Sequence, residues 1–170
     1  MKQLLGLLRS KRGAAAVEMA LVVPLLLIIM MGSFELGNYF MDEHKLVKAV
    51  RDGARYAGRQ PFGSFYTCPS TVDNTGTTAG QIRNVVRTGL LTGGSNRIVN
   101  WTDAQITISL TCPTTANSVP LSGIYRGSAD GAPVVTVSAS VPYTPVLASY
   151  GFRGVGFNLN ATQQAAVMGL

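Results

Sequence analysis

The feature that most constrains this chain is a run of 21 predominantly apolar residues, AAAVEMALVVPLLLIIMMGSF, at positions 14–34. A helix rises about 1.5 Å per residue, so this run is about 31 Å long, which matches the hydrocarbon core of a bilayer. It is too long for an ordinary cleaved secretory signal, and no small-x-small cleavage site follows it. The sequence therefore predicts one transmembrane helix that remains in the protein as an anchor.

Positive charge is concentrated before this run. Residues 1–13 contain four basic residues and no acidic one, whereas residues 14–60 contain five of each kind. A basic segment beside an apolar span favours the cytoplasmic side of the membrane. We therefore expect a single-pass protein with a cytoplasmic N-terminus and an extracytoplasmic C-terminal domain. The net charge of +6 is not distributed as in a nucleic-acid binder, so we expect no nucleic-acid partner.

Helical periodicity continues beyond the predicted span. Apolar residues recur at three- and four-residue spacings, and a basic stripe has the same period. The apolar positions are Leu36, Phe40, Val47, Val50, Ala54 and Ala57, and the basic positions are Lys45, Lys48, Arg51, Arg55 and Arg59. Asp42 and Asp52 lie within helical reach of Lys45, or of Lys48 and Arg55, which predicts ion pairs within the helix.

These patterns predict one continuous helix from about Ala14 to about Ala57, which Gly58 and Pro61 end. The predicted organisation is a basic cytoplasmic leader at 1–13 and a transmembrane part at 14–34. An extracytoplasmic amphipathic part of the helix follows at 35–60, and a small extracytoplasmic domain occupies 61–170.

The outer domain has the pattern of a small α+β fold. Thr78-x-x-Gln81 resembles a capping box and predicts a helix that ends at Gly93-Gly94. Residues 106–112 and 135–141 alternate apolar side chains with Thr and Ser, which is typical of half-buried strands. A weaker third strand is expected near residues 157–167. The predicted fold class is a long N-terminal helix followed by a domain with one helix and a short antiparallel sheet.

The residue inventory gives no support for catalysis. The one histidine, His44, lies among charges on the long helix. Asp73, Asp103 and Asp130 are isolated in the outer domain and typical of turns. The sequence has no Cys/His cluster for zinc, no calcium loop and no phosphate-binding glycine motif. We therefore expect no enzyme, metal, cofactor or small-molecule substrate.

Cys68 and Cys112 are the two cysteines of the chain. Both follow the apolar run, on the predicted outer side of the membrane, where disulfides persist. We predict a bridge that closes a loop of about 44 residues. The alternative is two buried free thiols.

Glu18 is the acidic residue inside the apolar run. A carboxylate within a membrane span is costly and indicates a functional site. The alternative is that Glu18 lies only one turn into the span and reaches the headgroups. The surrounding pattern favours a function, because basic residues, Gly13 and four small apolar residues precede Glu18 and an apolar helix follows it.

Residues 11–24, KRGAAAVEMALVVP, resemble the start of TadE-like proteins, which are minor pseudopilins of the tight-adherence, Flp-type branch of type IV pilus systems. Residues 51–57, RDGARYA, resemble the second signature of this family through Arg51, Gly53, Arg55 and Tyr56. Residues 135–144, VTVSASVPYT, resemble the family's later strand.

The resemblance implies that a prepilin peptidase cuts between Gly13 and Ala14 on the cytoplasmic side. It also implies that Glu18 docks the subunit into a growing filament, with the new amine of Ala14 in a neighbouring subunit as its partner. Other Flp-type pilins and pseudopilins, and the assembly platform of the bacterial inner membrane, are the expected partners. Met19 stands where major pilins commonly have tyrosine, and about 110 residues follow the helix. Both departures favour a minor pseudopilin.

Two other readings remain open from the sequence. One is an uncleaved single-pass membrane protein of the same export machinery. The other is a membrane-tethered enzyme or ligand-binding domain, for which no convergent polar constellation is visible.

Overall fold

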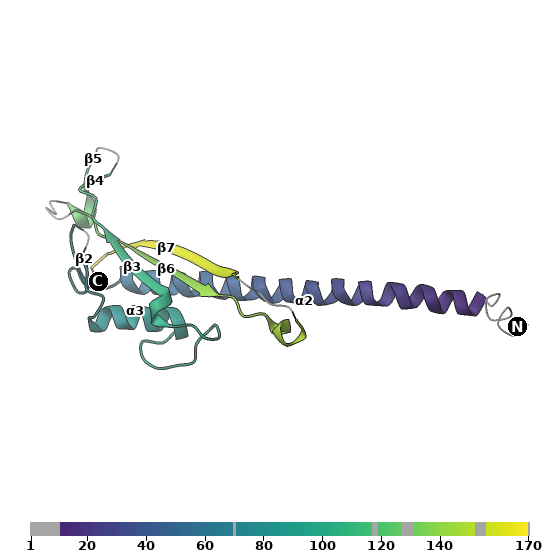
Figure 1. Cartoon of the computed structure of the whole chain (residues 1–170). Coiled ribbons are helices and arrows are strands. Elements are labelled where there is room, and N and C mark those ends of the chain that lie inside the picture. Colours follow the sequence, from purple (N-terminus) through teal and green to yellow (C-terminus); the bar gives the residue numbers. More distant parts are fainter. Residues whose placement is uncertain (1–10, 70, 117–118, 127–130, 152–155, 170) are drawn as a thin grey trace, which may run out of the picture. The chain divides into compact units, whose positions relative to one another are not determined.

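The computed structural model describes residues 11–69, 71–116, 119–126, 131–151 and 156–169 (Figure 1). Most of the basic leader, and Asp130, lie outside the described residues. The chain divides into two compact units. The first unit comprises Met1–Tyr39 and Pro145–Arg153, and the second comprises Phe40–Thr144 and Gly154–Leu170.

The longest element is α2, a helix of 48 residues at Lys11–Gly58 that contains Pro24. The carbonyl of Gly58 accepts a hydrogen bond from the Met168 N–H at 2.8 Å, so the C-terminal segment satisfies one of the carbonyls that a helix end leaves unpaired. The predicted continuous helix is confirmed. It is the helix, among the residues described, that is long and apolar enough to cross a membrane.

The buried stripe of α2 differs in part from the predicted apolar face. The predicted members Leu36, Phe40 and Val47 are exposed. The stripe that is fully buried consists of Leu46, Ala49, Val50, Ala54 and Ala57. A helix turns about 100° per residue, so Val47 lies at the edge of this stripe, beyond Ala54, and is 39% exposed. The burial of Val50, Ala54 and Ala57 agrees with the sequence pattern.

The next α-helix after α2 is α3, Thr77–Thr88. The predicted capping box at Thr78 and Gln81 is wrong, because the N-cap is Gly76 and no side chain caps it. The helix also ends before the predicted Gly93-Gly94 pair. Gly89 adopts the left-handed conformation at φ 85° directly after Thr88, and this conformation ends the helix where glycine tolerates it.

The main sheet contains β3 (Ile106–Thr111), β6 (Val134–Pro142) and β7 (Asn158–Ala166), in the order β3-β6-β7 with antiparallel pairing. Ile106 lies opposite Ala139, which lies opposite Ala161. Alternate residues of β3 and β6 are buried, as the period of two requires. All three predicted strands are confirmed, including the weak third one.

Two small antiparallel pairs accompany the sheet, and the sequence reasoning missed both. They are β1 (Tyr66–Thr67) with β2 (Thr71–Val72), and β4 (Thr115–Ala116) with β5 (Val119–Pro120). Strands of two residues carry too few side chains to leave a period in the sequence. Short 3₁₀ turns lie at Asp103–Gln105 (η1), Gly123–Tyr125 (η2) and Val146–Tyr150 (η3).

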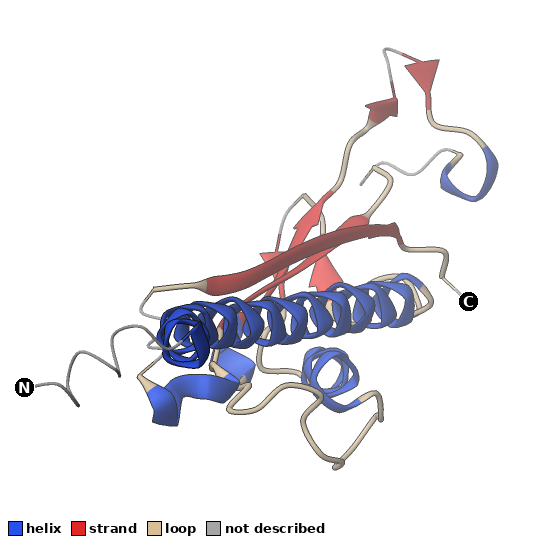
Figure 2. Ribbon diagram, turned by 90° about the vertical axis from the view of Figure 1, so that its right-hand side faces the viewer, coloured by secondary structure: helices blue, strands red, loops and turns tan. Residues whose placement is uncertain are grey.

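The core of the second unit lies between the outer part of α2, α3 and the main sheet. Figure 2 shows the three-stranded sheet along one side of α2 and α3 on another. The fully buried side chains come from all three elements and from the loops between them. The largest are Trp101, Phe65, Leu46, Ile82 and Leu159. The fold is therefore α+β, a long N-terminal apolar helix followed by a smaller domain, as predicted.

Candidate functional site

The apolar part of α2 exposes its side chains on every face. Every residue from Gly13 to Met30 is exposed in the chain by itself, and Leu21 keeps 73% of its surface. A soluble domain rarely leaves so large a contiguous apolar surface in water, because burying such area is the main favourable term in folding. This segment therefore requires an apolar environment that the described residues do not supply.

Gly13, Ala14 and Glu18 all lie in the first turns of α2. Glu18 is exposed and makes no hydrogen bond or ion pair with the residues that the structure describes. Glu18 lies four positions after Ala14, so the two positions lie one above the other on the same helix face. The predicted cleavage and docking positions therefore share one surface of the helix.

The ion pairs of the outer part of α2 differ from the prediction at one aspartate. Asp42 accepts from Lys45 at 2.7 Å, as predicted. Asp52 does not pair within the helix, because its carboxylate meets Arg97 at 2.8 Å, 45 residues further along the chain. The helical spacing to Lys48 and Arg55 therefore predicted the wrong partner for Asp52.

A stripe of basic side chains lies along the outer end of α2 and the residue that follows it. It consists of Lys48, Arg51 and Arg55 on α2 and of Arg59, which directly follows the last residue of the helix, and all four are exposed. None of the four makes an ion pair with a residue in the described part of the chain. Spacings of three and four residues place Lys48, Arg51 and Arg55 on one face of the helix, where they can meet an anionic partner.

The residues of the second signature have two different structural roles. A Cβ at Gly53 would overlap the side chain of Val86, so glycine at this position permits α3 to approach α2. The Tyr56 hydroxyl donates to Gln81 Oε1 at 2.8 Å and ties the same two helices together. Arg51 and Arg55, in contrast, face outward. The signature therefore combines a helix–helix contact with an exposed basic surface.

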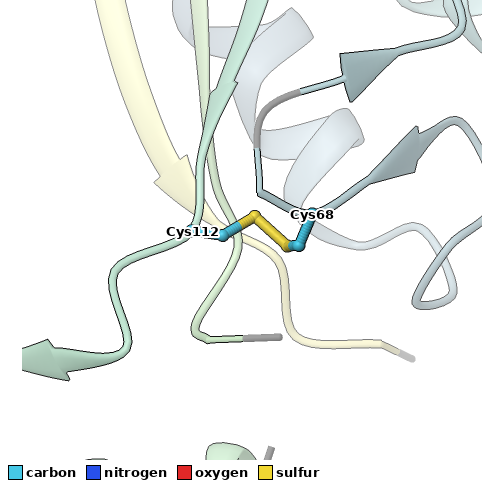
Figure 3. The surroundings of a disulfide bond; sticks show 2 residues. All are labelled: Cys68 and Cys112. Atoms are coloured by element: carbon cyan, nitrogen blue, oxygen red, sulfur yellow. A yellow bond between two sulfur atoms is a disulfide. The ribbon is translucent and has the colours of Figure 1, made fainter. Parts of the chain in front are cut away.

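Cys68 and Cys112 form a disulfide in the structure, which confirms the predicted pairing (Figure 3). The bridge joins the residue after β1 to the residue after β3, and its Cα atoms are 5.8 Å apart. It closes a separation of 44 residues. The bridge therefore links the connection between β1 and β2 to the end of β3, an edge strand of the main sheet.

A cavity of about 420 Å³ lies beside the disulfide. Its lining includes Phe62, Tyr66, Ile124 and Tyr125, and the rings of Phe62 and Tyr125 meet edge to face with centroids 6.2 Å apart. Sequence reasoning missed this cavity. Its walls come from separate segments that carry no common motif, so nothing in the sequence places them together.

The two tyrosine hydroxyls of this cavity have different surroundings. The Tyr125 hydroxyl donates to the carbonyl of Val167 at 2.6 Å. The Tyr66 hydroxyl is buried and has no partner that meets hydrogen-bond geometry among the described residues. Burial raises the pKa of Tyr66 above its usual 10.0, and the nearby backbone of Gly63 offsets part of this shift. Burial also raises the pKa of Tyr125.

Two of the outer-domain aspartates have structural partners. Asp73 Oδ1 accepts from the Thr75 hydroxyl and from the amides of Thr75 and Gly76, and these bonds hold the pKa of Asp73 below its usual value. This turn role is as predicted. Asp103 is not isolated, because it lies 2.7 Å from Arg87 Nε. The described residues contain no group of three or more His, Cys, Asp or Glu that could hold a metal.

Comparison with known proteins gives one match. The family model described as TadE-like protein matches residues 13–55, which confirms the resemblance over the apolar part of α2 and most of the second signature. No curated protein and no solved structure matches the chain. Proteins of this family are structural components of the tight-adherence (Tad) pilus, and the family is not known as an enzyme family. The match therefore supports a protein associated with this pilus.

Proposed function

We propose that this chain is a TadE-like minor pseudopilin, a membrane-anchored structural component in the biogenesis of a tight-adherence, Flp-type pilus that acts in adhesion. The observation that carries the proposal is the family match over residues 13–55. This match includes Glu18 in the apolar segment and Gly53 at the contact between α2 and α3. The matched residues therefore include the apolar surface of α2 and the contact through which α3 packs against α2.

The proposed topology places residues 1–13 in the cytoplasm, residues 14–34 in the inner membrane, and residues 35–60 and 61–170 outside. The basic leader supports this orientation. The Cys68–Cys112 disulfide supports it independently, because disulfides persist in extracytoplasmic compartments and are rare in the cytoplasm.

A prepilin peptidase is the proposed processing partner, with cleavage between Gly13 and Ala14. This bond lies between the third and fourth described residues of α2. Glycine adds no side chain beside the scissile bond.

Cleavage would leave an ammonium group on Ala14. In a filament, this group and the Glu18 carboxylate of a neighbouring subunit would form a pair buried among apolar helices. The other pilins and pseudopilins, and the inner-membrane platform that assembles them, are the proposed partners. A buried ion pair is favourable only when its geometry is good. The pair would therefore fix the axial position of one subunit relative to the next and would add little stability.

The test removes the Glu18 carboxylate and measures surface piliation together with processing. Glu18→Ala and Glu18→Gln should both be processed at Gly13 and inserted in the membrane, yet should fail to assemble. Glu43→Gln is the matched control, because Glu43 lies on the same helix outside the apolar segment. Normal piliation with Glu18→Ala would contradict the docking role and leave Glu18 as a carboxylate that reaches the headgroups.

The uncleaved alternative is separated from the proposal by the N-terminus of the membrane-bound protein. Mass spectrometry should find a chain that begins at Ala14 in cells with an active prepilin peptidase, and Gly13→Leu should abolish this product. A chain that still begins at Met1 in those cells would favour an uncleaved membrane protein of the same export machinery.

The cavity beside the disulfide favours a second candidate, a membrane-tethered ligand-binding domain. Its volume of about 420 Å³ falls in the range of small-molecule sites, and aromatic side chains line it. The amphipathic dye 8-anilinonaphthalene-1-sulfonate tests whether the cavity accepts a ligand. Phe62→Ala should reduce dye fluorescence if the dye binds there, while equal fluorescence in both proteins would count against this candidate.

A further inference from the structure

Two backbone N–H groups of the η3 turn donate hydrogen bonds to one carboxylate of α2. Glu35 Oε1 accepts the Val146 N–H at 3.2 Å, and Glu35 Oε2 accepts the Leu147 N–H at 3.0 Å. Both partners belong to the first compact unit, together with the apolar part of α2. Hydrogen bonds to an ionised acceptor are shorter and stronger than neutral ones. The turn therefore has a defined position along the helix, at residue 35.

This position is the outer end of the apolar segment. Residues 14–34 form a helix of about 31 Å, close to the thickness of a hydrocarbon core. Glu35 follows Phe34 directly, so its backbone lies about 1.5 Å further along the helix axis. The headgroup layer adds about 5–8 Å on each side of the core. A carboxylate at residue 35, and the turn that it holds, therefore fall within that layer.

The chemistry of the turn fits this layer. Its first three residues are Val146, Leu147 and Ala148, all uncharged, and Val146 is 65% exposed in the chain. The neighbouring Phe34 is 67% exposed. The two backbone N–H groups supply hydrogen bonds to Glu35 that water would otherwise supply, which lowers the cost of placing a carboxylate at the membrane boundary.

We propose that the η3 turn is a second membrane contact, which lies in the outer headgroup layer with Val146 directed into the bilayer interface. The occupant of the Val146 surface is the lipid bilayer itself, because Val146 is hydrogen-bonded to Glu35, the residue that directly follows the apolar segment. The inference rests on the proposed membrane anchoring of α2. Its consequence is mechanical, since a contact to lipid beside the helix limits how far the helix can slide along the membrane normal.

The experiment places a tryptophan in the turn and measures quenching by lipid. The full chain is reconstituted in phosphatidylcholine vesicles whose acyl chains are brominated near the headgroup end. Val146→Trp is compared with Leu27→Trp, inside the apolar segment, and with Val99→Trp. Val99 is the matched control, because it is a valine that is 68% exposed and belongs to the second unit, which the proposal places in the aqueous phase. The native Trp101 is 1% exposed, and its signal is subtracted as a constant.

We expect brominated lipid to quench Val146→Trp and Leu27→Trp but to leave Val99→Trp unchanged. Quenching at Leu27 without quenching at Val146 would overturn the membrane contact and leave the anchor intact. Absence of quenching at Leu27 would instead refute the membrane anchoring, so the two failures are distinguishable. An iodide quencher in the aqueous phase should give the opposite order of accessibility.

The role of Glu35 is tested in the same vesicles. Glu35→Ala removes both acceptors of the turn, so Val146→Trp should lose most of its lipid quenching in this background. Leu27→Trp should keep its quenching, because the apolar segment is unchanged. Unchanged quenching of Val146→Trp in the Glu35→Ala background would show that Glu35 does not set the depth of the turn, contrary to the proposal.

Discussion

The contact between Gly53 and Val86 gives the sharpest quantitative prediction. An added Cβ at position 53 would overlap Cγ2 of Val86, and the next atoms lie at 3.6 and 3.7 Å. Val86 is fully buried and β-branched, so it has few rotamers into which it can move. In Gly53→Ala, therefore, either α3 shifts away from α2 or Val86 adopts a strained conformation.

Two opposing terms determine the stability of this variant. Overpacking a core costs about 1–3 kcal/mol. Alanine in a helix interior is better than glycine by about 0.8–1.0 kcal/mol. We therefore expect Gly53→Ala to lower the free energy of unfolding by about 1 kcal/mol. Gly80 is the matched control, because it lies in α3 with no atom within 4 Å of its hypothetical Cβ. Gly80→Ala should raise stability by up to about 1 kcal/mol.

The assay is urea unfolding of the full chain in detergent micelles, followed by the fluorescence of Trp101. This is the one tryptophan of the chain, and its burial makes it a reporter of the second unit. In a Val86→Ala background the overlap disappears, so Gly53→Ala should become neutral or stabilising there. A Gly53→Ala protein that gains as much stability as Gly80→Ala would refute the packing argument.

Three further predictions concern the second unit. Cys68→Ala and Cys112→Ala should each lower the free energy of unfolding by about 4 kcal/mol, as expected for a closed loop of about 44 residues, and wild-type protein should migrate differently after reduction. Asp52→Asn should cost about 0.2–1 kcal/mol, less at high salt, and a double-mutant cycle with Arg97→Ala should show that the two effects are not additive. Because burial raises the pKa of Tyr66 in the folded state, its contribution is fully present below pH 10 and is lost as the pH rises through the folded pKa; Tyr66→Phe should reduce this alkaline loss of stability in urea titrations at pH 9 and 11.

The elements that sequence reasoning predicted are those with long periodic patterns. The helix at Lys11–Gly58 has a sustained apolar run and a clear stop, and the alternation in β3 and β6 continues through six and nine residues. The disulfide followed from the position of both cysteines beyond the span. In each case the deciding signal is local, or depends on the compartment, and does not require knowledge of the tertiary arrangement.

The errors arise where a distant segment changes a local preference. Gln81 has the spacing of a capping residue relative to Thr78, but its side chain accepts the hydroxyl of Tyr56 instead. Asp52 has basic neighbours one helical turn away, yet Arg97 takes its carboxylate. The attachment of η3 to Glu35 likewise joins residues more than 100 positions apart. Contacts of this kind leave no period in the sequence, so only the folded structure reveals them.

The two parts of α2 differ in which of their side chains are buried. From Gly13 to Met30 the helix exposes apolar side chains on all faces, whereas the buried stripe that holds the second unit begins at Leu46. None of the core residues of that stripe lies in the apolar segment. The folding energy of the second unit therefore does not depend on what surrounds the apolar segment. Under the proposed function, such a chain could exchange lipid for neighbouring helices around residues 14–34 while its outer domain stays folded, which is what transfer from a membrane into a filament would demand.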